Sequence, residues 1–321
     1  MPRVFIEDLS EGYRHAIREG LAFLGGDCHL RPGDRVAVKP NLTFPRYRRG
    51  VMTNPEAIEA LVVHLIDLGC RVTICESDSG GYNRFSMDEV FRVTGIADFA
   101  QRCGAQVVNL SGAPAREIEL KTGWRRLRVP LPGLLLDETD WFITMPVPKV
   151  HCNTVISGAV KNQWGVIQDP SLRLKLHPYF QHVIYAVNKS LPRTLVVMDG
   201  KYGLNHNGPM RGEAVELNWL LMSDSVFAAD LALADLLGIP WRGVPYLRFC
   251  CRKERWNGSE TVESNRDLEP FRKVRFQLKR EWTDLPGLAT FHSRALAWLG
   301  YESALAAPLH RLLYRFREPF Y

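Results

Sequence analysis

Short apolar runs recur along the first two thirds of the chain, and polar residues follow each of them. The clearest runs cover residues 35–42, 71–76, 141–145 and 194–198. Apolar runs of this length that end in turn-forming residues are typical of strands buried inside a sheet. Between the first two runs, Thr53 or Asn54 as cap, followed by Pro55 and Glu56, predicts the start of a helix, and Gly69 predicts its end. A strand, a helix and a second strand in this order predict a parallel pair with a right-handed crossover.

The alternation of helix and strand patterns continues to about residue 240. Further helices are expected at residues 87–103, from Thr154 onward, at 176–190 and at 224–237. Further strands are expected at 106–110 and 217–223. Residues 112–138 are expected to form a strand pair or an irregular excursion. An amphipathic helical pattern returns at residues 293–316. We therefore predict an α/β fold, with a mostly parallel open sheet and flanking helices, over residues 1–240. Residues 241–321 are expected to form a largely helical C-terminal extension that packs on the core or at an oligomer interface.

The composition narrows the class of protein. The chain of 321 residues is 46% hydrophobic and 24% charged, which is typical of a globular protein, and its net charge is +6. This weak basicity favours an anionic small molecule as a partner and is too low to indicate nucleic acid. No apolar run reaches membrane-spanning length, and the N-terminus lacks the apolar region of a signal peptide. We expect a cytoplasmic protein that binds no nucleic acid and is not an integral membrane protein.

The cysteines agree with a reducing compartment. There are seven of them, and they form neither a CxxC pair nor the cysteine run that holds ferredoxin-type clusters. Cys70 and Cys75 lie among apolar residues, which predicts buried thiols. We expect no iron–sulfur cluster.

Charged and amide side chains gather where the predicted strands end. Lys39 and Asn41 follow the first strand, Glu76 and Asp78 follow the second, Lys149 and His151 follow the third, and Asp199 follows the fourth. The carboxyl ends of parallel strands form the ligand site of open α/β sheets. Because Lys39 and Lys149 directly follow apolar residues, they should be sheltered, and a sheltered lysine needs an anion or a carboxylate as a partner. Glu76 and Asp78 are the alternative partners, in a purely structural ion network.

The segment 149–165 combines lysine, histidine, asparagine, threonine and serine just after a buried strand. A helix that begins near Thr154 places Ser157, Lys161 and Gly165 on one face. The amino end of such a helix favours an anion. The pattern predicts a phosphate or carboxylate held by Lys149, Ser157 and Lys161, and ordinary surface lysines are the alternative interpretation.

His151 is the best candidate for general acid or base catalysis, because the ordinary pKa of histidine lies near neutrality. Lys149 and Asn153 beside it strengthen this interpretation, while a structural histidine is the alternative. His151 with Glu76, Asp78 or Asp199 forms a conceivable metal site, but no metal-binding spacing supports it, and we assign no metal. The sequence also lacks dinucleotide, P-loop and nucleophile-elbow motifs, so the cofactor stays open.

Several of these pieces occur together in one order. They are Val36–Leu42, Thr53–Pro55, Glu76 and Ser77 with Gly80 and Gly81, Lys149–His151, Ser157–Gly165, Asp199 and Gly200, and Asn207–Pro209. Over residues 33–240 the chain resembles the bacterial and archaeal family known as domain of unknown function 362. Members of that family are often joined to ferredoxin-type iron–sulfur modules. This chain lacks the cysteines for such a module, so it resembles a stand-alone member.

The candidate residues favour an enzyme that acts on an anionic small molecule by proton transfer, as in an isomerisation, elimination or cyclisation of specialised metabolism. The expected catalytic residues are Lys149, His151, Lys161 and Asp199. The expected substrate-binding residues are Lys39, Asn41, Glu76, Asp78, Asn153, Ser157 and Asn162. One alternative is a redox enzyme that borrows a cofactor or an external ferredoxin. Another is a non-catalytic binding or assembly protein, and the C-terminal helix is also a candidate contact for a homo-oligomer.

Overall fold

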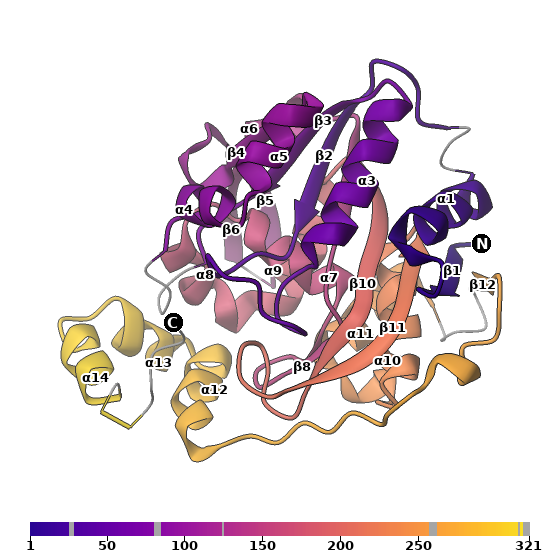
Figure 1. Cartoon of the computed structure of the whole chain (residues 1–321). Helices are drawn as coiled ribbons and strands as arrows, with labels where there is room; N and C mark the ends of the chain where they lie inside the picture. Colours follow the sequence, from indigo (N-terminus) through magenta and orange to yellow (C-terminus); the bar gives the residue numbers. More distant parts are fainter. Residues whose placement is uncertain (26–28, 80–84, 124, 257–261, 314, 317–321) are drawn as a thin grey trace.

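Ten strands of the described residues form one twisted sheet that runs through the molecule (Figure 1). The computed structural model describes residues 1–25, 29–79, 85–123, 125–256, 262–313 and 315–316. Gly80, Gly81 and Cys28 therefore lie outside the described residues. The main path of the sheet is β12 (Glu263–Ser264), β1 (Arg3–Asp8), β11 (Glu213–Ser223), β10 (Arg193–Asn205), β7 (Trp141–Met145), β2 (Arg35–Pro40), β3 (Arg71–Glu76) and β4 (Gln106–Asn109).

The sheet is mostly parallel, as the sequence predicts. Strands β10, β7, β2, β3 and β4 all run in one direction. Strand β11 runs against both β10 and β1. For residues 112–138 we expected a strand pair or an irregular excursion. The structure has a separate antiparallel pair there, β5 (Ala115–Thr122) and β6 (Arg125–Pro132), which α6 (Gly133–Asp137) follows. The fold is α/β.

Helices cover both faces of the sheet (Figure 1). One apolar core lies under α1 (Gly12–Leu24), α3 (Pro55–Asp67), α4 (Met87–Val93) and α5 (Ile96–Cys103). The other core lies under α7 (Ala159–Asn162), α9 (Phe180–Ser190), α10 (Val226–Leu236) and α11 (Pro245–Glu254). The side chain of Asn54 caps α3 by accepting a hydrogen bond from Glu56 N at 3.0 Å, which confirms the predicted helix start.

Several element boundaries differ from the expectation. The helix expected at residues 87–103 is two helices, because Gly95 adopts a left-handed conformation between α4 and α5. The helix expected at 176–190 begins at Phe180, after α8 (Pro170–Leu176) and a short 3₁₀ turn. Helix α10 is capped by Ser225 and not by Asp224, which instead pairs with Arg3.

The largest difference lies in the segment 149–157. It forms a hairpin of β8 (Lys149–His151) and β9 (Val155–Ser157), not the expected helix. The β-branched Val150 and Ile156 favour extended backbone, and β10 continues far enough to pair Leu204 with Lys149. The helix expected from Thr154 is therefore wrong, and no helix amino end stands at Thr154 to favour an anion there.

The C-terminal segment is largely helical and touches the core through part of its surface. It contains α12 (Leu285–His292), α13 (Arg294–Tyr301) and α14 (Ala306–Leu313). Phe291 of α12 is buried in the core beside His177 and Phe180. Large apolar side chains on the outer side of this segment stay exposed, among them Trp282, Trp298, Leu305, Leu312 and Phe316. Among the helices of the described residues, none combines the length and the apolar character that a membrane span requires.

Candidate functional site

A cavity of about 170 Å³ lies where β2 and β3 end and the β8–β9 hairpin begins. We call it the lysine cavity. Seven of the predicted site residues line it together, namely Lys39, Asn41, Glu76, Lys149, Ser157, Lys161 and Asn162. Its walls also include Thr43, Val51, Ser79, Trp164, Gly165, Arg173, Pro209 and Met210. The ends of parallel strands thus meet at one site, as the topology requires.

Lys39 and Glu76 form a buried ion pair at the ends of two neighbouring strands. Their side chains are 1% and 5% exposed, and Lys39 Nζ donates to Glu76 Oε2 at 2.8 Å. The carboxylate also accepts from Ser77 N at 2.9 Å and from Leu42 N at 3.4 Å. A Cβ atom at Gly165 would lie 3.0 Å from both charged groups, so glycine leaves room for the pair. Glu76 is the carboxylate that compensates Lys39.

Lys149 is buried at the start of the hairpin and meets a carbonyl oxygen instead of a carboxylate. Its ammonium donates to Val51 O at 2.8 Å, and the same oxygen accepts from Asn41 Nδ2 at 2.7 Å. Burial, followed by the charges of Lys161 and Lys39, lowers the pKa of Lys149 to about 7. Both the charged and the neutral form of this amine are therefore populated near neutral pH.

Lys161 reaches the cavity from α7, directly after β9. Within the described part of the chain, its ammonium has no hydrogen-bond acceptor and no ion-pair partner. Burial, together with the charges of Arg173 and Lys39, lowers the pKa of Lys161 to about 8. Lys161, which the sequence placed on a helix face, is thus a buried cation whose side chain lines the lysine cavity.

Arg173 completes the positive wall, and sequence reasoning missed it. Its guanidinium donates to Ile167 O at 2.7 Å and Asp78 O at 2.8 Å, and also to Ser77 Oγ. These acceptors carry no full charge, and burial lowers the pKa of Arg173. The available signal was weak, because Arg173 shares a face of α8 with the buried Leu176, three residues later.

The lysine cavity therefore holds more positive than negative charge. Its described lining contains four cationic side chains, those of Lys39, Lys149, Lys161 and Arg173, and a single carboxylate, that of Glu76. Buried cations without a countercharge destabilise a protein unless an anion joins them. The arrangement is suited to a bound carboxylate or phosphate group.

Asp78 and Asp199 lie away from this lining. Asp78 Oδ1 accepts from Met87 N at 2.6 Å and from Asn109 Nδ2 at 3.1 Å, so it supports the start of α4. Asp199 lies inside β10, which continues past the predicted strand end. Its carboxylate accepts from Tyr13 Oη and Asn54 N, both at 2.7 Å, and burial raises its pKa. It therefore joins α1 and α3 to the sheet.

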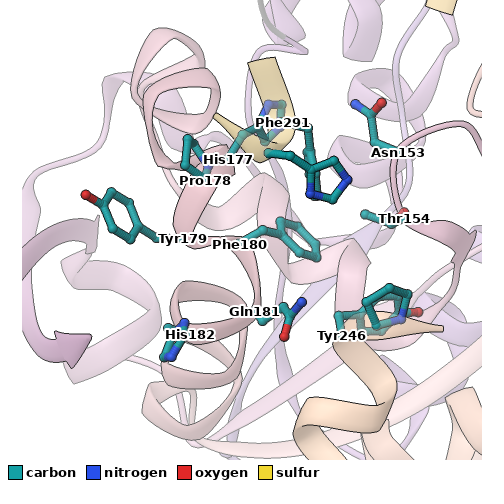
Figure 2. A pocket seen from close by; sticks show the side chains of 12 residues that line it. Asn153, Thr154, His177, Pro178, Tyr179, Phe180, Gln181, His182, Tyr246 and Phe291 are labelled. Carbon is teal, nitrogen blue, oxygen red and sulfur yellow. The ribbon is translucent and has the colours of Figure 1, made fainter. Parts of the chain in front are cut away.

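His151 and Asn153 also lie outside the lining of the lysine cavity. His151 is buried, and its Nδ1 accepts from Asn153 N at 3.1 Å. Burial and the charges of Lys161 and Lys149 hold the pKa of His151 well below its usual range, so the ring is neutral at neutral pH. Asn153 lines a second cavity of about 190 Å³, in which Figure 2 shows the aromatic side chains of Phe180, Tyr246 and Phe291.

Asn162 and the hairpin fix the position of Lys161. Asn162 Nδ2 donates to Thr144 Oγ1 at 2.8 Å and to Lys39 O at 3.4 Å, which ties α7 to two strands of the sheet. Ser157 stands opposite Lys149 in the hairpin register. Within the described residues, no group of three or more His, Cys, Asp or Glu side chains is placed to hold a metal ion.

Comparison with known proteins gives three findings. The family described as a domain of unknown function (DUF362) matches residues 36–235. The thylakoid-associated protein sll1697 of Synechocystis sp. is 26% identical over 239 residues, which cover 72% of this chain and 71% of that protein. A crystal structure of a Thermotoga maritima protein aligns with a TM-score of 0.42 and 14% identity, over 76% of this chain and 59% of the solved chain.

Proposed function

The chain belongs to the DUF362 family, and we propose that it is an enzyme that binds a small anionic molecule in the lysine cavity and moves a proton beside the anionic group. The observation that carries this proposal is the charge imbalance of the cavity, four cationic side chains against one carboxylate. Its size favours a small carboxylate or phosphate compound over a larger ligand.

An anion at this site would compensate charges that the protein leaves uncompensated. Lys39 already has Glu76, whereas Lys161 has no partner and Arg173 donates to carbonyl and hydroxyl oxygens. In a buried setting, a charge-assisted hydrogen bond between Arg or Lys and a carboxylate or phosphate is stronger than one between neutral groups. Binding energy is therefore available from Lys161 and Arg173.

Proton transfer is supported by the two lysines with lowered pKa values. With a pKa of about 7 for Lys149 and about 8 for Lys161, each amine can take up or release a proton near neutral pH. Isomerisation, elimination and cyclisation beside a carboxylate each require an acid and a base within reach of the substrate. We assign these roles to Lys149 and Lys161, and the expected role of His151 stays a hypothesis.

Three alternatives have less support. A redox enzyme with a borrowed flavin or nucleotide would need a longer pocket than a compact cavity of about 170 Å³. A purely structural ion network would pair both strand-end lysines with carboxylates, but Lys149 donates to the carbonyl oxygen of Val51 at 2.8 Å. An assembly role for the C-terminal helices has less support because Phe291 docks α12 on the core of the same chain.

The proposal is tested by anion binding to the full chain. We expect phosphate, oxalate or citrate to raise the melting temperature, and Lys161→Met to remove most of this effect. The exposed Lys175, which lies 3.8 Å from Glu302, gives a matched control, and Lys175→Met should leave the effect unchanged. No anion-dependent rise in the parent chain, or an equal rise in Lys161→Met, would contradict the anion site.

Proton transfer is tested separately in deuterated water. Each carboxylate or phosphate that binds is incubated with the protein, and proton NMR follows the exchange of its C–H groups. We expect exchange in at least one ligand and a loss of at least tenfold in rate in Lys149→Met. Binding without exchange in any bound ligand would favour a binding protein over an enzyme.

Location and assembly also stay proposals. We propose a cytoplasmic protein, while the name of the Synechocystis relative makes attachment to a membrane the alternative. Cell fractionation decides between them, because a protein that sediments with membranes and is released by detergent contradicts the cytoplasmic location. The expected homo-oligomer is tested by native mass spectrometry, which should detect a species of more than one chain.

A further inference from the structure

The three lysines that reach the lysine cavity differ in what their ammonium groups contact. Lys39 Nζ is held by the carboxylate of Glu76 at 2.8 Å, and Lys149 Nζ is held by Val51 O at 2.8 Å. Lys161 Nζ has no hydrogen-bond acceptor or ion-pair partner in the described part of the structure, although its side chain lines the same space. An amine without an acceptor is free to use its lone pair once it loses a proton.

The surroundings of Lys161 increase the share of that neutral form. Burial and the neighbouring charges of Arg173 and Lys39 lower its pKa to about 8, although Cys152 acts in the opposite direction, so about a tenth of the amine is uncharged at pH 7. Desolvation and a second cationic group are the conditions that activate a lysine amine toward carbonyl carbons. Its backbone is also fixed, because Asp230 accepts from Ala159 N and Val160 N, at 2.6 and 3.3 Å, just before Lys161.

We propose that Lys161 forms a Schiff base with the carbonyl carbon of a small oxo acid bound in the lysine cavity. This inference rests on the proposed function and names its substrate class, a carboxylate with an adjacent ketone or aldehyde. Arg173 lines the same cavity, and its permanent positive charge attracts the carboxylate, while its guanidinium donates to Ile167 O, Asp78 O, Ser77 Oγ and Gly165 O. The amine of Lys161 then meets the carbonyl group.

The step balances with the groups present. The lone pair of neutral Lys161 Nζ forms the C–N bond while the C=O π electrons move to oxygen, which takes a proton from the Lys149 ammonium. The new C–N nitrogen returns a proton to Lys149, and a second transfer from Lys149 lets the hydroxyl leave as water. The nitrogen lone pair closes the C=N bond, so amine, carbonyl and one proton give iminium and water. The iminium withdraws electrons from the adjacent carbon, whose proton can then leave.

Reductive trapping tests the inference. The full chain is incubated with pyruvate or glyoxylate and sodium cyanoborohydride, and intact mass spectrometry followed by peptide mapping locates the adduct. We expect a single reduced adduct on Lys161 at low millimolar oxo acid. Lys161→Met should lower the labelling at least tenfold, while Lys175→Met should leave it unchanged. Melting curves of both variants check that they are folded.

Oxalate separates this inference from the proposed function, because it is an anion of similar size that has no ketone or aldehyde. If oxalate stabilises the parent chain but not Lys161→Met, and neither oxo acid is trapped on Lys161, the Schiff base is wrong and the anion site stands. If neither oxalate nor the oxo acids bind, both proposals fail. Labelling confined to surface lysines or to Lys149 also overturns the assignment to Lys161.

Discussion

At the scale of single residues, burial of a lysine has opposite consequences at two positions of one cavity. Lys39 compensates a buried carboxylate, whereas Lys161 is a buried cation that has no ion-pair partner within the described residues and only Cys152 to raise its pKa. Removing the first therefore creates an unpaired charge, and removing the second eliminates one. The two substitutions separate structural from ligand-directed lysines.

Lys39→Met should lower the free energy of unfolding by about 3–5 kcal/mol, because Glu76 stays buried without its partner. Urea denaturation monitored by tryptophan fluorescence measures this change. In the double variant Lys39→Met, Glu76→Leu, most of the loss should be recovered, since apolar side chains of similar volume replace the pair. Equal losses in the single and double variants would show that the pair itself is not the cause.

Lys161→Met should instead raise the free energy of unfolding by about 1–3 kcal/mol at pH 7 without added anions, because a desolvated ammonium is replaced by an apolar side chain. The same denaturation experiment measures it. Lys175→Met replaces an exposed lysine and should change stability by less than about 0.5 kcal/mol. A destabilised Lys161→Met would mean that this ammonium has a stabilising role in the empty cavity.

The sequence located the lysines of the cavity but not their individual environments. Strand-end position is enough to bring Lys39 and Lys149 together, because parallel strands share one edge. It does not show which carboxylate turns inward, and Glu76 does so while Asp78 supports α4. Arg173 was missed because it lies on α8, just beyond the segment 149–165, and the face that it shares with Leu176 indicates burial but not a cavity.

At the scale of elements, the β8–β9 hairpin shows where local pattern and tertiary pairing diverge. Ser157, Lys161 and Gly165 have a helical spacing, yet Ser157 belongs to β9 and Lys161 to α7. The pairing of Lys149 with Leu204 becomes available only because β10 extends to Asn205. A single sequence does not reveal that extension, since the apolar run that marks the strand ends at Met198.

The docking of α12 gives an element-scale prediction. Phe291→Ala should lower the free energy of unfolding by about 3–5 kcal/mol, because the ring is 8% exposed and packs on Phe180 and His177. Trp298→Ala on α13 is the matched control, since that ring is 58% exposed and should contribute less than about 1 kcal/mol. Thermal and urea denaturation of both variants measure the difference. Similar losses at the two positions would mean that α12 is not docked through Phe291.

At the scale of the whole molecule, the alternation of helix and strand patterns was sufficient to predict the parallel half of the sheet. Strand β1 needs a pairing between residues more than 200 positions apart, such as Val4 with Ser223, to join β11, which itself pairs with its sequence neighbour β10. Local periodicity contains no information on such pairs. The sheet nevertheless determines the electrostatics of the site, because it holds several lysines away from water at one edge.

The burial of Lys149 and Lys161 predicts how the stability of the whole protein depends on pH. The folded pKa of Lys149 is about 7 and that of Lys161 about 8, both below the ordinary value of 10.5. Between pH 7 and 9 the unfolded chain therefore binds more protons at these lysines than the folded chain, and stability rises with pH. The rise is at most about 1.4 kcal/mol per pH unit for each lysine. Urea denaturation at several pH values in this window measures the slope.

Other groups set the limits of that window. Asp230 has a folded pKa of about 7, above its ordinary 3.8, so its contribution to stability falls as pH rises toward 7. Cys75 has a folded pKa of about 12 against its ordinary 9.0, so its contribution to stability falls above pH 9.

The double variant Lys149→Met, Lys161→Met should lose the rise in stability between pH 7 and 9. It should keep the falls in stability that Asp230 and Cys75 cause below pH 7 and above pH 9. Saturating phosphate should flatten the rise in the parent chain as well, because a bound anion raises both lysine pKa values toward 10.5. If the slope survives in the double variant, charged lysines at the sheet edge are not the source of the pH dependence.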